Sequence, residues 1–168
     1  FGTFPTVSET FLLREIAALS QMDVPLVLLA LARGPNQPLH SMARPWLKGV
    51  IYRPRERPGE LAAAPFAAGL RWWAGVQRPA RMAAGLAWRY PLLGREIAMS
   101  FLSACYFATR VGTRICHVHA TFASIPATVG LFLAEILGTG FSFAGHARDI
   151  FTREATFLPL KIREAEFV

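Results

Sequence analysis

Alternating apolar and polar residues, followed by a long apolar stretch, predict a strand, a helix and a second strand between residues 113 and 144. The alternation in 113–120 places His117 and His119 on one strand face. We expect the helix to begin at Ser124-Ile125-Pro126, where serine caps and proline is tolerated, and to end at Gly138. Residues 141–144 predict the second strand. Because a crossover helix joins parallel neighbours, His119 and His146 should meet at the carboxyl edge of the sheet, where ligands bind in open α/β folds.

The first part of the chain predicts a loop, an amphipathic helix and a strand. Residues 1–5 have the character of a loop that follows a strand, and Thr6-Val7-Ser8-Glu9 matches a capping box, so a helix should begin near Val7. Its free amides form an anion site unless Glu9 satisfies them itself. The continuous apolar run over 24–31 is typical of a strand covered on both faces, and residues 50–53 predict a short strand.

Two or three helices are predicted in the middle of the chain, over about 60–76, 79–89 and 93–110, with Pro79 and Pro91 as the breaks. A short helix over 158–166 should expose Lys161, and Phe167-Val168 should begin a further strand. This order of elements predicts an α/β fold with a Rossmann-like parallel sheet and flanking helices, in one domain over residues 1–168. Because the chain starts without methionine and stops in an expected strand, we expect a fragment clipped at both ends.

Composition favours a folded domain and adds an uneven charge. The chain has 168 residues, of which 53% are hydrophobic, and a net charge of +7. Between His40 and Thr113, eleven basic residues face three glutamates, so this basic helical section should attract an anionic partner. Cys105 and Cys116 have neither metal-ligand nor disulfide-framework spacing, which favours a reducing cytoplasm. No signal peptide or membrane span is predicted.

The basic section also carries aromatic residues, and two interpretations of them stay open. Trp72 and Trp88 face the core in the first, with the arginines as a solvated outer face. The second has the aromatic and arginine side chains contacting a membrane interface, at the inner face of the cytoplasmic membrane. We expect no nucleic-acid partner, because no recognised binding motif accompanies the charge.

Two segments resemble a known family. FPTVSETFLLREIAAL (4–19) is similar to the FP-x-x-SETF-x-x-x-E start of family 4 glycosyltransferases of the colanic-acid and exopolysaccharide type. HVHATFASIPATVGLFLAEILGTGFSFAGHARDIF (117–151) resembles the H-x-H-x-x-F-x-x-x-P-A-T and FS-x-x-x-H-A-x-D-I-F segments of that family. The resemblance implies the N-terminal, acceptor-side half of a two-domain GT-B enzyme. Such an enzyme transfers a sugar from a nucleotide sugar to an acceptor, here a lipid-linked or oligosaccharide precursor of a polysaccharide.

The same resemblance implies roles for individual residues. A histidine matching His146 lies by the donor sugar and is tied to catalysis, and the loop containing Gly2 and Thr3 lies by the donor phosphates. Family members are generally retaining and metal-independent, so we expect no metal and no cofactor beyond the nucleotide-sugar donor. Their paired glutamates belong to a C-terminal domain, without which this chain should not turn over substrate.

Each candidate residue also has a structural interpretation. His146 is either a hydrogen-bond partner of the donor sugar or a histidine packed at a strand end. Asp149 either orients His146 or bonds backbone amides as a helix cap. His119 either lines an acceptor cleft or packs, and a metal site with His117 is the weakest alternative. The remaining candidates are capping or first-turn residues that double as acceptor or phosphate contacts: Ser8, Glu9 and Thr10.

The whole chain therefore supports two classes of function. The first is the acceptor-binding half of a retaining glycosyltransferase. The second is a non-catalytic Rossmann-like module that docks on a membrane or an anionic partner. A dinucleotide-dependent enzyme is disfavoured, because no G-x-G-x-x-G follows a predicted strand.

Overall fold

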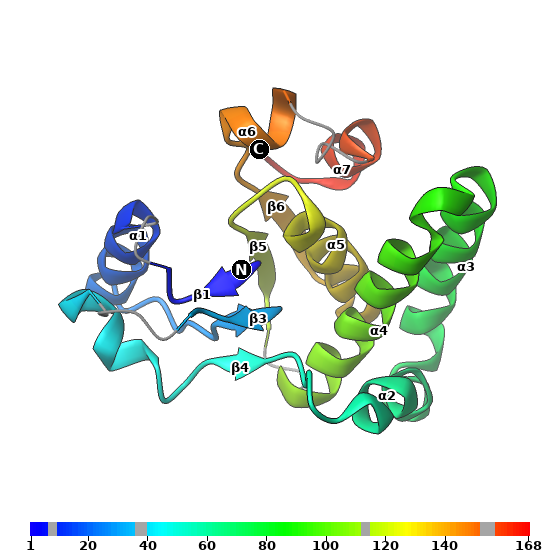
Figure 1. Ribbon diagram of the computed structural model, residues 1–168, viewed down its shortest axis with the longest axis horizontal. Helices are drawn as coiled ribbons and strands as arrows, with labels where there is room; N and C mark the ends of the chain where they lie inside the picture. The colour runs from blue at the N-terminus through cyan, green and yellow to red at the C-terminus, as the bar shows by residue number, and fades with distance from the viewer. Residues whose placement is uncertain (7–9, 36–39, 112–114, 152–156) are drawn as a thin grey trace. The chain divides into compact units, whose positions relative to one another are not determined.

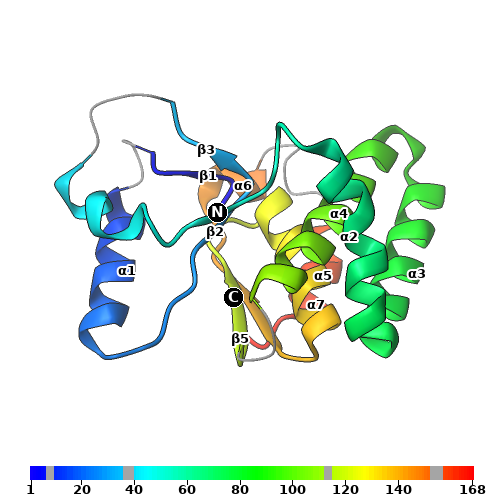
Figure 2. The same cartoon turned by 90° about the horizontal axis from the view of Figure 1, so that it is seen from below.

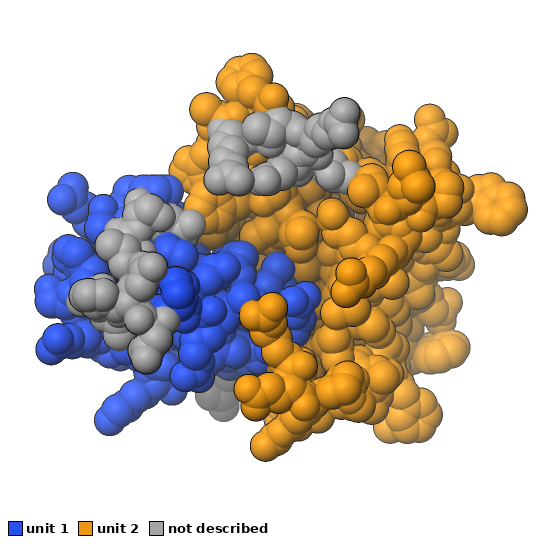
Figure 3. All heavy atoms as spheres, viewed as in Figure 1, with its two compact units in different colours: residues 1–53 blue, residues 54–168 orange. Residues whose placement is uncertain are grey.

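The computed structural model describes residues 1–6, 10–35, 40–111, 115–151 and 157–168, and its fold is mixed α/β with small parallel sheets (Figure 1). The chain forms two compact units, Phe1–Arg53 and Pro54–Val168, which we call unit 1 and unit 2 (Figure 3). Each unit is described by itself. The α/β class predicted from the sequence is confirmed at this level.

Unit 1 combines short parallel strand pairs with one amphipathic helix. The strand pairs are β1 (Thr3–Phe4) with β3 (Ala32–Arg33), and β2 (Leu29–Ala30) with β4 (Ile51–Tyr52). Helix α1 (Thr10–Gln21) buries Leu12, Leu13 and Ile16, and a 3-10 helix, η1 (Ser41–Trp46), packs near it. These elements enclose one apolar cluster that includes Phe4, Ile16 and Ala30. The predicted strand at 50–53 is thus confirmed as β4.

Two expectations for unit 1 are corrected. Thr3 and Phe4 pair as a strand, so residues 1–5 are not only a loop. The run over 24–31 is not one covered strand, because Val24 and Val27 are exposed and regular pairing begins only at Leu29. The chain leaves α1 through Asp23 in a left-handed conformation (φ 57°), and Pro25 offers no amide to a sheet. The expected capping box includes Ser8 and Glu9, which lie outside the described residues.

A helical layer forms much of unit 2. Its members are α2 (Pro58–Arg71), α3 (Trp73–Arg89) and α4 (Gly94–Val111), with a short 3-10 helix, η2 (Pro91–Leu93), before α4. The predicted break at Pro91 is confirmed, whereas the break at Pro79 is wrong. Pro79 is buried inside α3, where it removes a single helical hydrogen bond, and the chain breaks instead at Trp72, whose φ and ψ are −132° and 52°.

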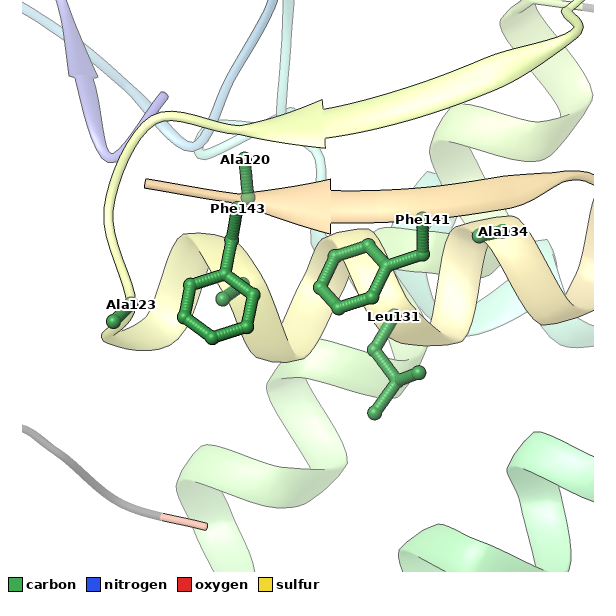
Figure 4. Close-up of a cluster of buried hydrophobic side chains, with 7 residues drawn as sticks. Ala120, Ala123, Leu131, Ala134, Phe141 and Phe143 are labelled. Carbon is green, nitrogen blue, oxygen red and sulfur yellow. The ribbon is translucent and has the colours of Figure 1, made fainter. Parts of the chain in front are cut away.

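The centre of unit 2 is a strand, helix and strand formed by β5 (His117–Ala120), α5 (Ile125–Leu137) and β6 (Gly140–Phe143). As predicted, α5 follows Ser124 and ends at Gly138, which has φ 67°, but the expected cap is absent because the Ser124 side chain forms no capping hydrogen bond. Figure 4 shows Phe141 and Phe143 of β6 beside Leu131 and Ala134 of α5 in a cluster of buried apolar side chains. This packing fixes the strand ends that precede the candidate site.

The end of the chain returns to this sheet. After β6 come α6 (Ala147–Phe151) and α7 (Leu158–Glu164). Phe167 then forms a parallel bridge with Ser142, and the Glu166 amide donates to the Phe141 carbonyl at 2.8 Å. The expected strand start at Phe167 is thereby confirmed as a single bridge beside β6. No helix among the described residues is both long enough and apolar enough to cross a bilayer.

Candidate functional site

The candidate site of unit 2 lies at the carboxyl ends of β5 and β6. The two strands are parallel, with His119 opposite Ser142 and Ala120 opposite Phe143. The pairing ends where the Ala144 amide donates to the Ala120 carbonyl at 2.9 Å. Beyond this point the chain leaves β5 through the turn 121–124 and leaves β6 through 145–146, so both exits start from the same sheet edge.

His117 and His119 lie on one face of β5, as predicted, and share a hydroxyl group. His117 Nε2 lies 2.7 Å from Ser142 Oγ, and His119 Nδ1 lies 2.8 Å from the same oxygen. A serine hydroxyl has one proton and two acceptor lone pairs, so it can donate to at most one of the two imidazoles. At least one ring nitrogen that faces Ser142 must therefore donate to Oγ, and Ser142 itself is fully buried.

An aromatic side chain covers this pair of imidazoles. The Phe167 ring stacks on His117 with 5.5 Å between centroids and 4° between planes, and on His119 with 6.4 Å and 19°. Glu166 Oε2 lies 3.6 Å from His117 Nδ1. His119 is nevertheless exposed, which leaves its ring accessible to a polar ligand at the sheet edge.

His146 lies between the end of β6 and α6, and its ring packs against the turn that follows β5. The centroids of the His146 and Phe122 rings are 5.0 Å apart at an interplanar angle of 55°. The His146 carbonyl accepts a hydrogen bond from the Ile150 amide at 3.2 Å, so the backbone also begins the α6 turn. The two strand exits thus meet through Phe122 and His146, and the imidazole is half-buried.

Asp149 binds the same turn from the first residues of α6. Its Oδ2 atom accepts from the Ala123 amide at 3.2 Å, and the residue is 4% exposed. Of the two roles predicted for Asp149, the hydrogen bond to a backbone amide is present. The amide is that of Ala123, which precedes α5, and it does not belong to the helix that contains Asp149. A charged acceptor forms a stronger hydrogen bond than a neutral one, which favours a fixed turn.

Lys161 completes the turn, and its predicted exposure is wrong. The residue is only 1% exposed, and Nζ donates to the carbonyl oxygens of Ala123 at 2.7 Å and Ser124 at 2.9 Å. Burial lowers the pKa of Lys161 to about 8, an effect opposed in part by the charges of Glu96 and Asp149. From a helical sequence pattern alone, a lysine is expected on the solvent-exposed face. Here hydrogen bonds to two loop carbonyls offset the cost of burying the ammonium group.

The other predicted site residues lie in unit 1. The Gly2 carbonyl accepts from the Ala32 amide at 2.9 Å, Thr3 pairs with Ala32 in the sheet, and Thr10 is the first residue of α1. Ser8 and Glu9 lie outside the described residues. In unit 2, His119 lies near the end of β5, and His146 and Asp149 follow β6 and both contact the turn after β5.

Three residues of the site were not predicted from the sequence. Ser142 was detectable in principle, because a parallel register places it opposite His119. Phe122 is the aromatic residue of the H-x-H-x-x-F segment, but the segment did not indicate its contact with His146, and Lys161 carried no signal because its partners are backbone atoms.

The polar groups that the arrangement offers to a ligand are imidazole nitrogens. Within the described ranges, no group of three or more His, Cys, Asp or Glu residues is placed to hold a metal ion. The imidazoles can donate or accept hydrogen bonds to hydroxyl groups of a polar ligand. Comparison of the chain with protein-family models, with curated proteins and with solved structures gave no match.

Proposed function

We propose that this chain is the acceptor-side, Rossmann-like half of a retaining GT-B glycosyltransferase. The observation that carries the proposal is the coincidence of the histidine-containing segment 117–151 with one strand, helix and strand unit of parallel topology. The family resemblance lies in the same residues whose contacts define the candidate site. The proposed acceptor is a lipid-linked polysaccharide precursor.

In this proposal His146 hydrogen-bonds a hydroxyl of the donor sugar. Its ring is supported by Phe122, at a centroid distance of 5.0 Å, and Phe122 belongs to the turn that Asp149 and Lys161 hold. Preorganised hydrogen-bonding groups lower a barrier because they need no reorganisation during the reaction. His119, exposed at the end of β5, is the proposed acceptor contact.

The reaction replaces one bond at the anomeric carbon by another. The bond from that carbon to the donor phosphate oxygen breaks, and the nucleoside diphosphate leaves with the electron pair. An acceptor hydroxyl forms the new glycosidic bond and passes its proton to the departing diphosphate oxygen. A C-terminal domain with paired glutamates supplies the rest of the donor site, so the present chain alone is expected to be inactive.

Transfer by the full-length protein tests this function. A panel of nucleotide sugars is incubated with a lipid-diphosphate acceptor, and both glycosylated lipid and released nucleoside diphosphate are measured. The proposal predicts equal amounts of the two products for one donor class, with the anomeric configuration retained. Absence of transfer across a broad donor and acceptor panel would contradict it and favour a non-catalytic binding module.

A further inference from the structure

The outer face of α3 carries a tryptophan at each end and an arginine between them. Trp73, Arg81 and Trp88 are spaced at i, i+8 and i+15, which places them on one side of an α-helix. Trp73 is 71% exposed and Trp88 is 90% exposed, and Arg81 is also exposed. The interpretation in which Trp88 faces the core is therefore wrong. At 1.5 Å per residue, the two indoles are separated by roughly 22 Å along the helix axis.

The exposed face of α2 extends this surface with apolar side chains. Phe66 and Leu70 are 73% and 75% exposed, one helical turn apart, and Ala62 precedes them by another turn. Cε3 of Trp73 lies 3.9 Å from the position that a Cβ on Gly69 would take, so the indole packs back toward α2. Figures 1 and 2 show α2 and α3 at the edge of the helical layer of unit 2. We name Phe66, Leu70, Trp73, Arg81 and Trp88 the α2–α3 face.

The charge around this face is positive because the neighbouring carboxylates are neutralised. Glu135 and Glu164 both pair with Arg78, Glu164 pairs also with Arg163, and Glu60 pairs with Arg57 and Arg110. Helix α3 itself contains three arginines and no acidic residue. Arg81 forms no ion pair with any residue that the structure describes, so its guanidinium is available to an external anion.

We propose that the α2–α3 face docks on the surface of a bilayer that contains anionic phospholipid. Tryptophan rings favour the depth of the lipid head groups, apolar side chains enter the acyl boundary, and arginine pairs with lipid phosphate. An acidic protein surface would satisfy Arg81, but it would leave the apolar face of α2 and both indoles without apolar partners. This inference uses residues other than those of the candidate site and holds whether or not the proposed transfer reaction occurs.

Vesicle binding by the whole chain tests the inference. Co-sedimentation is measured with phosphatidylcholine vesicles with and without phosphatidylglycerol, for the wild type and for Arg81→Glu and Trp73→Ala/Trp88→Ala. We expect the wild type to prefer the anionic vesicles, and each variant to bind them at least about tenfold more weakly. The matched control is Arg14→Glu, which makes the same charge change at an exposed position of α1 and should bind within about twofold of the wild type.

Fluorescence locates the contact independently of affinity. Brominated phosphatidylcholine, mixed with phosphatidylglycerol, should quench wild-type tryptophan emission. In Trp73→Phe/Trp88→Phe, which keeps apolar rings on the face, binding should persist while most of the quenching disappears. The proposal is overturned if the wild type does not prefer anionic vesicles, or if Arg14→Glu weakens binding as much as Arg81→Glu. Quenching that survives in the double phenylalanine variant also overturns it.

Discussion

Asp149 and Lys161 bind opposite sides of one residue: the Asp149 carboxylate accepts from the Ala123 amide, and the Lys161 ammonium group donates to the Ala123 carbonyl. Both side chains are buried. They come from α6 and α7, which follow β6, whereas Ala123 lies in the turn after β5. The two charged residues therefore tie the exits of neighbouring strands together, next to the contact between Phe122 and His146.

Removing the Asp149 carboxylate should weaken this connection. We expect Asp149→Ala to lower the free energy of unfolding by about 1–3 kcal/mol, because the Ala123 amide loses its acceptor inside the protein. Asp149→Asn keeps a carbonyl oxygen at the same position and should lose less. Urea unfolding of both variants measures the difference. Equal losses would mean that this hydrogen bond does not carry the effect.

Lys161 should give the protein a specific pH dependence. Its pKa of about 8 lies below the ordinary lysine value of 10.5, so the unfolded chain binds this proton more tightly than the folded chain. The stability cost is complete below pH 8 and disappears as the pH rises toward 10.5. Relative to Lys161→Met, the wild-type free energy of unfolding should therefore increase by about 3 kcal/mol across this window.

An exposed lysine provides the control for this experiment. Lys48→Met removes an ammonium group that is already in solvent, so its curve of stability against pH should run parallel to that of the wild type. The account of Lys161 fails if the Lys161→Met curve is parallel as well. Urea titrations at several pH values between 7.5 and 10.5 supply the comparison.

Two glycines of α3 should respond in opposite directions to the same substitution. A Cβ on Gly75 would lie within contact distance of the Ile136 carbonyl oxygen in α5, whereas nothing lies within 4 Å of a Cβ on Gly85. Gly75→Ala should destabilise the protein by roughly 1–3 kcal/mol because α3 must move away from α5. Gly85→Ala should stabilise it by about 0.5–1 kcal/mol. Thermal unfolding distinguishes the two, and a stabilising Gly75→Ala would refute the close approach of the helices.

The shared hydroxyl of Ser142 should be visible in the imidazole spectra. In the neutral state, His117 Nε2 and His119 Nδ1 cannot both accept from Ser142 Oγ, because the hydroxyl has a single proton, so at least one of the two nitrogens must donate. Nitrogen NMR of the wild type should therefore show at least one protonated nitrogen at these two positions. Ser142→Ala should change the signals of both rings, and a change in neither would exclude the shared contact.

The sequence predicted those features of unit 2 that depend on local chemistry. Ser124 and Gly138 were placed correctly at the ends of α5, where Gly138 takes the left-handed conformation, although the Ser124 side chain forms no capping hydrogen bond. Strand alternation likewise placed His117 and His119 on one face. These signals involve neighbouring residues, so no tertiary structure is needed to interpret them.

Features set by distant partners could not be predicted in this way. Lys161 is buried because Ala123 and Ser124 present carbonyl oxygens to it, and no local pattern identifies such acceptors. Pro79 removes one hydrogen bond of α3, and its ring is buried in the protein. The neighbours that bury this ring are not visible in the local sequence. The outward position of Trp88 depends on which side of α3 the other helices cover, and hydrophobicity alone does not determine it.

Sugar transfer by the full-length protein with His146→Ala tests the central claim most directly. His146→Gln, which keeps hydrogen-bonding groups, and His40→Ala, at an exposed histidine of unit 1, are measured beside it. We predict that turnover falls at least about a hundredfold in His146→Ala, equivalent to roughly 2.7 kcal/mol of barrier, with partial recovery in His146→Gln and wild-type rates in His40→Ala. Equal turnover in wild type and His146→Ala, with the same thermal stability, would contradict the account and make His146 a packing residue.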